Sequence, residues 1–293
     1  MERISKALEK SHREMPQEMG AELSLGPTSM ERISKALEKT QRADPTGAGF
    51  PDRPQIATPS GIKYPQTRSV PISRAFLGEQ RVVAGCDPGP FVDAYKILRT
   101  KVLQRMREQG WNTLGITSPS PNAGKTLTAI NLAISIALEV NQTVLLVDAD
   151  LRHPSVHRFF GIEPTYGLSD YLLDNTPLQN ILISPQDLDE GFVILPGKRP
   201  LPNPSEMISS PKMQELVEDL KTRYPSRIVV FDLPHLGTAD TLAFAPYVDA
   251  MLLVIEEGRT TQEALQEAIE QLRSTELLGT VLNKAAISDS SEQ

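Results

Sequence analysis

The pattern of apolar and polar positions changes at Phe91. From there to about residue 287, short continuous apolar runs such as TVLLVDAD and RIVVFDLP alternate with amphipathic segments such as SPKMQELVEDLKTRY. Apolar runs of this length are typical of strands that are buried on both faces, and the amphipathic helices between them allow successive strands to run parallel. The pattern predicts an α/β domain over residues 91–287, with one doubly wound, mostly parallel sheet.

The residues before this domain follow a different pattern. The decapeptide MERISKALEK occurs twice, beginning at Met1 and at Met30, and its Ile, Ala and Leu stand at i, i+3 and i+4 on one helix face. Residues 1–39 are therefore predicted to contain two short amphipathic helices. A helix of about ten residues is not stable alone in water, so each needs a surface to pack on. Two interpretations stay open: the copies dock on a domain or partner, or the first copy is a duplication or upstream start without a role.

A linker is predicted between these repeats and the domain. Residues 40–90 hold eight prolines and few apolar residues in any regular pattern. Such a composition buries too little apolar surface to offset the entropy lost on folding, so this N-terminal extension is predicted to be mostly disordered. The exception is the segment from Ala75 to Ala84, which is interpreted as a short strand. Residues 288–293 are predicted to be a short disordered tail.

Composition and charge restrict the class of protein. A net charge of −7 argues against nucleic acid as a partner, because nucleic-acid binders carry a basic surplus. The single cysteine, Cys86, allows no internal disulfide and no cysteine-rich metal site. The apolar runs fall short of the ~18 residues of a membrane span, and the charged N-terminus is unlike a signal peptide. The sequence predicts a cytoplasmic protein that reaches the inner membrane only through a partner.

The clearest chemical motif is SPSPNAGKT, between a predicted strand and a predicted helix. Glycine, lysine and threonine at such a turn present backbone N–H groups, a helix N-terminus and a cation to a polyphosphate. Lys125 is expected to contact the terminal phosphates, and Thr126 to hold Mg²⁺. The other loop residues expected at the nucleotide are Asn122, Ala123, Gly124 and Leu127. The loop departs from the usual motif because Pro119 stands where a glycine is common.

Three aspartates follow two of the predicted buried strands. Asp148 and Asp150 end the run TVLLVDAD, and Asp232 ends IVVFD. The carboxyl ends of parallel strands share the edge of the sheet where ligands bind. Carboxylates gathered there repel one another unless a cation lies among them, and the Mg²⁺ of a nucleotide would supply it. The alternative, that each Asp only ends a strand, accounts less well for three of them beside a phosphate loop.

Together these motifs resemble a known family. SPSPNAGKT, LLVDADLR and VVFDLP are similar, in this order, to motifs of the bacterial tyrosine kinases of exopolysaccharide and capsule export (BY-kinases), which are related to MinD- and ParA-type ATPases. The resemblance runs from about Asp93 to Lys284 and includes GKRPLPNPSEMI and DAYKILR. It implies a P-loop NTPase fold of the deviant-Walker, MinD-like type, with ATP and Mg²⁺ as cofactors.

The resemblance also implies roles for individual residues. Lys125 and Thr126 would bind phosphate and metal, and Asp150 and Asp232 would organise Mg²⁺. Asp148 would orient the attacking hydroxyl. Arg152 would neutralise charge, or alternatively only cap a surface loop. Asn283 matches the position that meets the adenine, and the following letters lack the Asp of the guanine-reading N-K-x-D pattern, which favours ATP over GTP.

The implied function is an ATP-dependent protein tyrosine kinase that regulates polysaccharide polymerisation and export. Its implied partners are the cytoplasmic segments of a membrane chain-length regulator, or polysaccharide co-polymerase, and further copies of itself in a nucleotide-dependent homo-oligomer. The family's assembly motif E-x-x-R-x-x-R has Asp93 and Lys96 here, with Arg99 retained. Because Lys cannot make the planar bidentate bonds of Arg, ring formation is expected to be weaker.

Two alternatives to the kinase remain. The sequence ends AAISDSSEQ, without the tyrosine cluster of the family's autokinases, so a kinase would phosphorylate a partner or one of its own scattered tyrosines. A regulatory ATPase switch of the same machinery, without kinase activity, is the first alternative. A positioning ATPase of the MinD or ParA kind is less favoured, because Ser120 replaces the second lysine of that loop.

Overall fold

The structure is a computed structural model, and it describes residues 67–83, 89–186, 188–189, 191–223 and 226–285. Both copies of MERISKALEK, Cys86 and the predicted tail lie outside these residues. The predictions for residues 1–39 and 288–293 therefore stay predictions. None of the helices in the described ranges combines the length and the apolar character that crossing a membrane requires.

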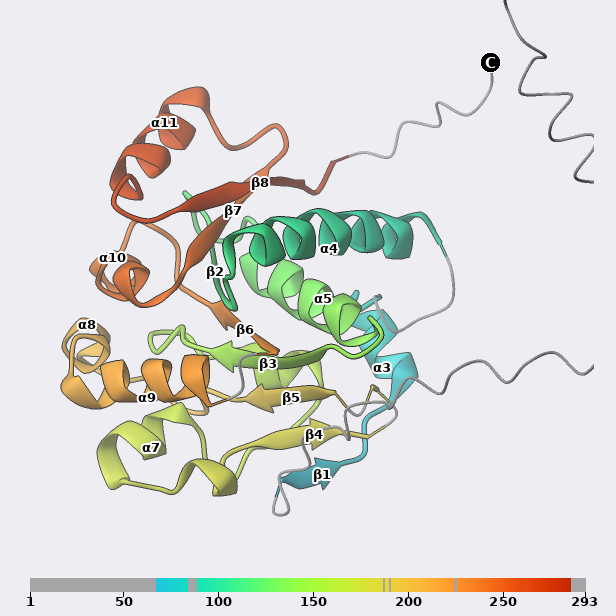
Figure 1. The fold of residues 1–293 in the computed structure, drawn as a ribbon, viewed down its shortest axis with the longest axis vertical. Coiled ribbons are helices and arrows are strands. Elements are labelled where there is room, and N and C mark those ends of the chain that lie inside the picture. Colours follow the sequence, from blue (N-terminus) through green and yellow to red (C-terminus); the bar gives the residue numbers. More distant parts are fainter. Residues whose placement is uncertain (1–66, 84–88, 187, 190, 224–225, 286–293) are drawn as a thin grey trace, which may run out of the picture. The chain divides into compact units, whose positions relative to one another are not determined.

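Eight strands form one sheet in the order β1-β4-β5-β3-β6-β2-β7-β8 (Figure 1). Neighbouring strands are parallel throughout, except that β4 and β5 are antiparallel. The predicted mostly parallel sheet is therefore confirmed. The strands are β1 Arg68–Val70, β2 Thr113–Thr117, β3 Thr143–Asp148, β4 Ile183–Pro185, β5 Phe192–Leu195, β6 Arg227–Asp232, β7 Ala250–Glu256 and β8 Leu277–Asn283.

Helices cover both faces of this sheet (Figure 1). One hydrophobic core contains side chains of α3, α4 and α5, and a second contains side chains of α7, α8, α9 and α11. The helices are α3 Arg74–Glu79, α4 Pro90–Gln109, α5 Lys125–Ala137, α6 Val156–Phe159, α7 Leu168–Asp174, α8 Pro204–Ile208, α9 Pro211–Thr222, α10 Ala239–Phe244 and α11 Gln262–Gln271, with 3₁₀ turns η1 Leu178–Asn180 and η2 Ala245–Tyr247.

The central strands explain why the apolar runs in the sequence are continuous. In β3, Val144 and Leu146 belong to the first core, whereas Leu145 and Val147 belong to the second. Successive side chains of a strand point to opposite faces, so a strand covered on both faces needs apolar residues at every position. The sheet is thus doubly wound, and its central strands present only their ends to solvent and ligands.

The segment between residues 67 and 83 differs from the prediction. The expected short strand from Ala75 to Ala84 is wrong, because Arg74–Glu79 form helix α3. Ser73 caps this helix by accepting a hydrogen bond from the backbone N–H of Phe76 at 3.3 Å. Leu77 and Val82 are buried in the first core. Part of the stretch predicted as linker therefore packs on the domain, and the edge strand is instead β1, which pairs with β4.

Candidate active site

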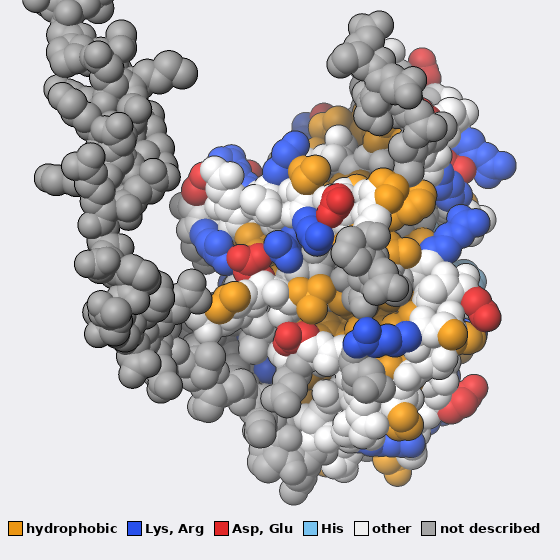
Figure 2. Space-filling view, turned by 90° about the vertical axis from the view of Figure 1, so that its right-hand side faces the viewer, with side chains coloured by type: hydrophobic (Ala, Val, Ile, Leu, Met, Phe, Trp, Pro, Cys, Tyr) orange, Lys and Arg blue, Asp and Glu red, His pale blue; other side chains and the backbone are white. Residues whose placement is uncertain are grey.

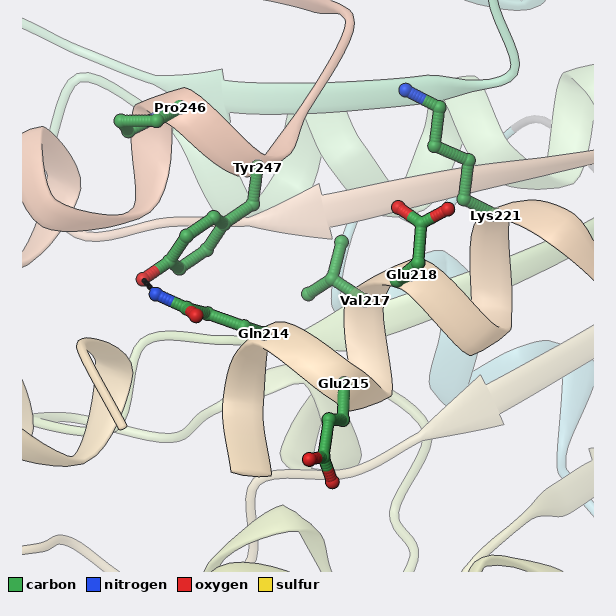
Figure 3. Close-up of a pocket in the computed structure, with 7 residues that line it drawn as sticks. All are labelled: Gln214, Glu215, Val217, Glu218, Lys221, Pro246 and Tyr247. Atoms are coloured by element: carbon green, nitrogen blue, oxygen red, sulfur yellow. Dashed lines mark hydrogen bonds between the residues drawn. The ribbon is translucent and has the colours of Figure 1, made fainter. Parts of the chain in front are cut away.

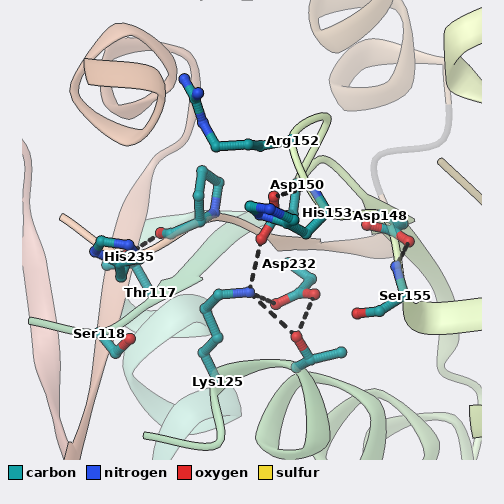
Figure 4. A network of polar contacts seen from close by, with 12 residues as sticks. Thr117, Ser118, Lys125, Asp148, Asp150, Arg152, His153, Ser155, Asp232 and His235 are labelled. Carbon is teal, nitrogen blue, oxygen red and sulfur yellow. Dashed lines mark hydrogen bonds and ion pairs between the residues drawn. The ribbon is translucent and has the colours of Figure 1, made fainter. Parts of the chain in front are cut away.

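The ends of three adjacent strands build the site. β3, β6 and β2 are neighbours in the sheet, and the register places Asp148 beside Asp232 at the carboxyl ends of β3 and β6. The loop after β2 leads to Gly124, whose φ of +94° belongs to the left-handed region that glycine tolerates, and α5 begins at the next residue. The phosphate-type loop and the aspartates thus meet at one edge of the sheet (Figure 4).

Lys125 lies between two of the carboxylates (Figure 4). Its Nζ is 3.0 Å from Asp150 Oδ2 and 3.6 Å from Asp232 Oδ1, and its side chain is only 14% exposed. The hydroxyl of Thr126 donates to Asp232 Oδ2 at 2.8 Å. The structure therefore brings together Lys125, Thr126, Asp150 and Asp232, the residues predicted to hold phosphate and metal.

Burial and charge act against each other at this cluster. Burial alone would lower the pKa of Lys125, but the carboxylates of Asp232 and Asp150 outweigh it and raise that pKa. Burial also raises the pKa of Asp232, although Lys125 and the Thr126 hydroxyl oppose the rise. Burial, with the neighbouring Asp232 next in importance, raises the pKa of Asp148 to about 8. The site holds more negative charge than Lys125 balances.

This surplus of buried carboxylate fits a divalent cation. Asp148 Oδ1 and Asp232 Oδ1 are both buried without a hydrogen-bond partner. Carboxylate and hydroxyl oxygens are ligands that Mg²⁺ prefers, and it commonly takes one or two carboxylates together with phosphate and water. Among the described residues no group of three or more His, Cys, Asp or Glu forms a complete metal site. The residues present therefore fit Mg²⁺ delivered with a nucleotide rather than a cage made of protein alone.

Asp148 is held differently from the other two aspartates. It is fully buried, and its Oδ2 accepts hydrogen bonds from the backbone N–H groups of Ser155 at 2.8 Å and Val156 at 3.0 Å. Gly197 covers the carboxyl so closely that a Cβ at this position would lie 3.2 Å from Asp148 Cγ. In this state the carboxyl faces backbone rather than an open cleft, and its predicted role toward a hydroxyl stays a prediction.

The structure does not bring Arg152 to the cluster. Its side chain points away from Lys125 (Figure 4) and makes a two-pronged ion pair with Asp240, at 3.0 Å from Nε to Oδ2 and 3.1 Å from Nη2 to Oδ1. Asp240 is fully buried and also accepts a bond from the Ser205 hydroxyl. In this state Arg152 connects the Asp150 loop to α10, and a role in neutralising phosphate charge remains a prediction.

Asn283 contacts the phosphate-type loop directly, and its predicted role toward the adenine stays a prediction. Its Nδ2 donates to the carbonyl of Ala123 at 2.8 Å, and a Cβ on Gly124 would lie 2.0 Å from the same nitrogen. The next residue, Lys284, donates to the carbonyl of Asn122 at 2.7 Å. The end of β8 therefore supports the loop. Asn283 and Ala123, the two residues of the first bond, are 160 residues apart in the sequence.

Replacing Asn283 with Ala is expected to weaken Mg·ATP binding by about fivefold, because one hydrogen bond that orients the loop, worth about 1 kcal/mol, is lost. Isothermal titration calorimetry measures the change. Leu282→Ala is the matched control, since that neighbouring side chain is 53% exposed. Equal affinities for Asn283→Ala and the wild type would contradict a role for Asn283 at the nucleotide.

Sequence reasoning missed two residues near the cluster, Gly197 and His235. His235 follows the strand end of Asp232 by three positions, and its Nδ1 accepts a hydrogen bond from the backbone N–H of Gly237 at 3.1 Å. Burial and then the nearby Lys125 lower the pKa of His235, so its imidazole is neutral at pH 7. Its position three residues after a strand-terminal Asp was the only sequence signal. Gly197 opens the segment GKRPLPNPSEMI, which is part of the family resemblance, but its contact with Asp148 is tertiary and no sequence pattern indicated it.

A separate hollow of about 470 Å³ lies between α9 and η2 (Figure 3). Its lining includes Gln214, Lys221 and Tyr247, and Gln214 Nε2 donates to the Tyr247 hydroxyl at 3.0 Å. Lys221 pairs with Asp249, which also accepts a bond from the backbone N–H of Thr113, the first residue of β2. The hollow thus lies near the amino ends of β2 and β7, and none of the predicted site residues lines it.

Comparison with known proteins agrees with this geometry. Residues 114–293 match the family described as the CobQ/CobB/MinD/ParA nucleotide binding domain. Tyrosine-protein kinase YwqD of Bacillus subtilis is 34% identical over 220 residues, which are 73% of this chain and 90% of that protein. Tyrosine-protein kinase etk of Escherichia coli K12 is 33% identical over 196 residues, 66% of this chain but only 26% of that protein, so the chain spans about a quarter of etk.

A solved structure gives the same result. The kinase domain of the Escherichia coli tyrosine kinase ETK is similar with a TM-score of 0.65 at 28% identity, over 77% of this chain and 91% of that one. The fold, the match to the nucleotide-binding domain and the similarity to YwqD all support the same family assignment. The chain belongs to the bacterial tyrosine-protein kinase family, on a nucleotide-binding domain of the CobQ/CobB/MinD/ParA type.

Proposed function

We propose that this protein is an ATP-dependent protein tyrosine kinase that uses Mg²⁺. One observation carries the proposal: Lys125, Thr126, Asp150 and Asp232 converge at the N-terminus of α5, in a chain whose relatives YwqD and etk are tyrosine-protein kinases. A helix N-terminus with a lysine and two carboxylates is suited to hold a polyphosphate with its cation.

Each residue has a distinct task in this proposal. Lys125, now paired with Asp150 and Asp232, exchanges those carboxylates for the terminal phosphates of ATP. Thr126, Asp150 and Asp232 would hold Mg²⁺, which neutralises phosphate charge when bound. The backbone N–H groups around Gly124 orient the phosphates. Because phosphoryl transfer depends mainly on positioning and electrostatics, these tasks account for most of the expected rate.

Asp148 is proposed to accept the proton of the tyrosine hydroxyl. That hydroxyl has an ordinary pKa near ~10, so it loses its proton only late in the transfer. The pKa of Asp148 is raised to about 8, so without nucleotide this carboxyl holds a proton near pH 7 and must first release it. Mg²⁺ bound beside Asp150 and Asp232 would favour that release, and the carboxylate could then accept the proton of the tyrosine. The carboxyl is covered by Gly197, so the turn that contains Gly197 must shift before a hydroxyl reaches it.

We also propose that the protein acts in exopolysaccharide or capsule export, with a membrane chain-length regulator as partner and a nucleotide-dependent homo-oligomer as its working form. The exposed apolar side chains Phe91 and Ile97 on α4, with Leu138 and Val140 after α5, support association. The side of the molecule on which α4 begins and α5 ends presents apolar side chains among lysines and arginines (Figure 2). Arg99 pairs with Glu139 at 3.1 Å within its own domain, whereas Asp93 and Lys96 stay exposed.

The proposal is tested with γ-labelled ATP, Mg²⁺ and a random Glu/Tyr copolymer as a generic acceptor. We expect phosphotyrosine on the copolymer, and its loss when EDTA removes Mg²⁺. Thr126→Val is expected to reduce transfer about tenfold or more, because one oxygen ligand for Mg²⁺ is lost at nearly equal side-chain volume. Thr100→Val on α4 is the control, since that hydroxyl only bonds the carbonyl of Lys96 in its own helix.

The second candidate function is a regulatory ATPase switch without kinase activity. The observation that favours it is the burial of Asp148, whose carboxyl is held by backbone N–H groups and covered by Gly197. A switch needs the nucleotide but no acceptor hydroxyl at Asp148. Release of inorganic phosphate without any phosphotyrosine, in the same experiment, would select the switch and reject the kinase.

A further inference from the structure

Tyr166 stands apart from the other tyrosines within the described residues, which are Tyr95, Tyr171 and Tyr247. It is 44% exposed, whereas the other three are half-buried. The hydroxyl of Tyr247 accepts a hydrogen bond from Gln214, and burial raises the pKa of Tyr95. Exposure makes Tyr166 the described tyrosine that another active site reaches most easily.

The surroundings of Tyr166 are suited to a phosphate. The Nζ of Lys198 lies 5.4 Å from the centre of the Tyr166 ring. Arg68 donates to the hydroxyl of the adjacent Thr165 at 2.8 Å, and Arg68, Thr165 and Tyr166 line one hollow of about 270 Å³. A phosphotyrosine carries nearly two negative charges and is stabilised by charge-assisted bonds from lysine and arginine. Lys198 already lies over this ring, and Arg68 lines the same hollow.

The same lysine belongs to the turn that covers Asp148. Lys198 has a φ of +71°, a conformation that costs energy for a residue with a Cβ, and its Nζ pairs with Asp170 at 3.2 Å. The preceding residue is Gly197, which lies against the Asp148 carboxyl. The carbonyl of Pro196 accepts a bond from the N–H of Leu168 at 2.7 Å, which ties the turn to the start of α7. A change of charge at Tyr166 therefore acts on Lys198, the residue that follows Gly197 in the turn over Asp148.

We propose that Tyr166 is a phosphorylation site of this protein, with its phosphate held by Lys198 and Arg68. The inference rests on the proposed kinase function, because ATP bound at Lys125 is the phosphoryl donor. The bond between the γ-phosphorus and its bridging oxygen breaks, ADP leaves, a bond forms from Tyr166 Oη to phosphorus, and the hydroxyl proton is released. Lys198 then moves from Asp170 toward the phosphate and loosens the turn over Asp148.

The first test maps the phosphate. Wild type, Tyr166→Phe and the matched control Tyr171→Phe are incubated with Mg·ATP and the Glu/Tyr copolymer, and phosphopeptides are fragmented by mass spectrometry. We expect phosphate on Tyr166 in the wild type and in Tyr171→Phe, and a several-fold drop in total label on the chain in Tyr166→Phe. Labelled copolymer with unlabelled Tyr166 overturns this inference alone, whereas no phosphotyrosine anywhere overturns the kinase function and this inference with it.

The second test concerns the cation that holds the phosphate. Lys198→Gln is expected to speed removal of phosphate from Tyr166 by an added tyrosine phosphatase several-fold, because the phosphate loses a charge-assisted bond. Lys212→Gln is the matched control, since Lys212 lies over the ring of Tyr171 at 5.0 Å from its centre. Equal removal rates in the wild type and Lys198→Gln contradict the assigned role of Lys198.

Discussion

Replacing Lys125 with Met is expected to reduce phosphoryl transfer to the Glu/Tyr copolymer by at least about a hundredfold, because the cation that stabilises charge on the transferring phosphate is lost. The side chain is aimed at this place by its position at the start of α5, and it is only 14% exposed. Met keeps the length of the side chain and its apolar packing. The loss therefore reports the ammonium charge rather than a cavity.

Lys101→Met is the matched control for this variant, since Lys101 is an exposed residue of α4. Initial rates with labelled ATP measure transfer, and circular dichroism verifies that each variant is folded. Nucleotide affinity by calorimetry then separates lost binding from lost catalysis. Transfer by Lys125→Met within about tenfold of the wild type would contradict the assignment of Lys125 to the phosphates, since loss of one such charge costs more.

The central strands could be predicted from the sequence because a strand buried on both faces needs a continuous run of apolar residues. β3 and β6 are buried along nearly their whole length, and their apolar runs are continuous. β1 and β4 could not be predicted in the same way. Each has only three residues, and they pair with each other from positions 115 residues apart, Arg68 with Ile183. A run of three residues is too short to show a hydrophobic periodicity, so pairing with the neighbouring strand determines its structure.

Helix α3 shows how tertiary contacts decide a local ambiguity. The run AFLGEQRVVA has apolar residues at both ends and suits either a strand or a short helix. In the structure its first half, as far as Glu79, is helical because Ser73 caps the start and Leu77 packs into the first core. The chain then continues to Val83, whose N–H donates to Asn131 Oδ1 at 2.7 Å. The Ser73 cap is local, but Asn131 and the core lie far along the sequence, so the pattern alone does not reveal them.

The sequence predicted which residues form the candidate site, but not which side chains they contact. Asp148, Asp150 and Asp232 meet because the carboxyl ends of parallel strands share one edge, which follows from the fold. The partner of Arg152 does not follow from the fold, since Asp240 is 88 residues away on α10. The burial of Asp148 beneath Gly197 is a matter of packing between a loop and a strand end. The sequence pattern predicts where a strand ends, whereas the pairing of side chains depends on the tertiary structure.

The raised pKa of Asp148 has a consequence for stability, whose sign follows from proton linkage. At pH values between the ordinary carboxyl value of 3.8 and about 8, the folded protein retains a proton that the unfolded chain has released. The unfolded state binds fewer protons there, so the free energy of unfolding falls as the pH rises. Below about pH 4 both states are protonated and the term vanishes, and above about pH 8 it reaches a constant value.

Replacing Asp148 with Asn is therefore expected to stabilise the nucleotide-free protein while abolishing tyrosine phosphorylation. The amide oxygen still accepts the bonds from Ser155 and Val156, and the amide nitrogen occupies the position of the unpartnered Oδ1 without adding charge. The gain should be small near pH 5 and reach a few kcal/mol near pH 8, since each unit of pKa shift corresponds to about 1.4 kcal/mol. Urea denaturation in EDTA at several pH values measures it. A gain that stays constant with pH would show that Asp148 is ionised throughout, because a carboxylate that never holds its proton gives no linkage between stability and pH.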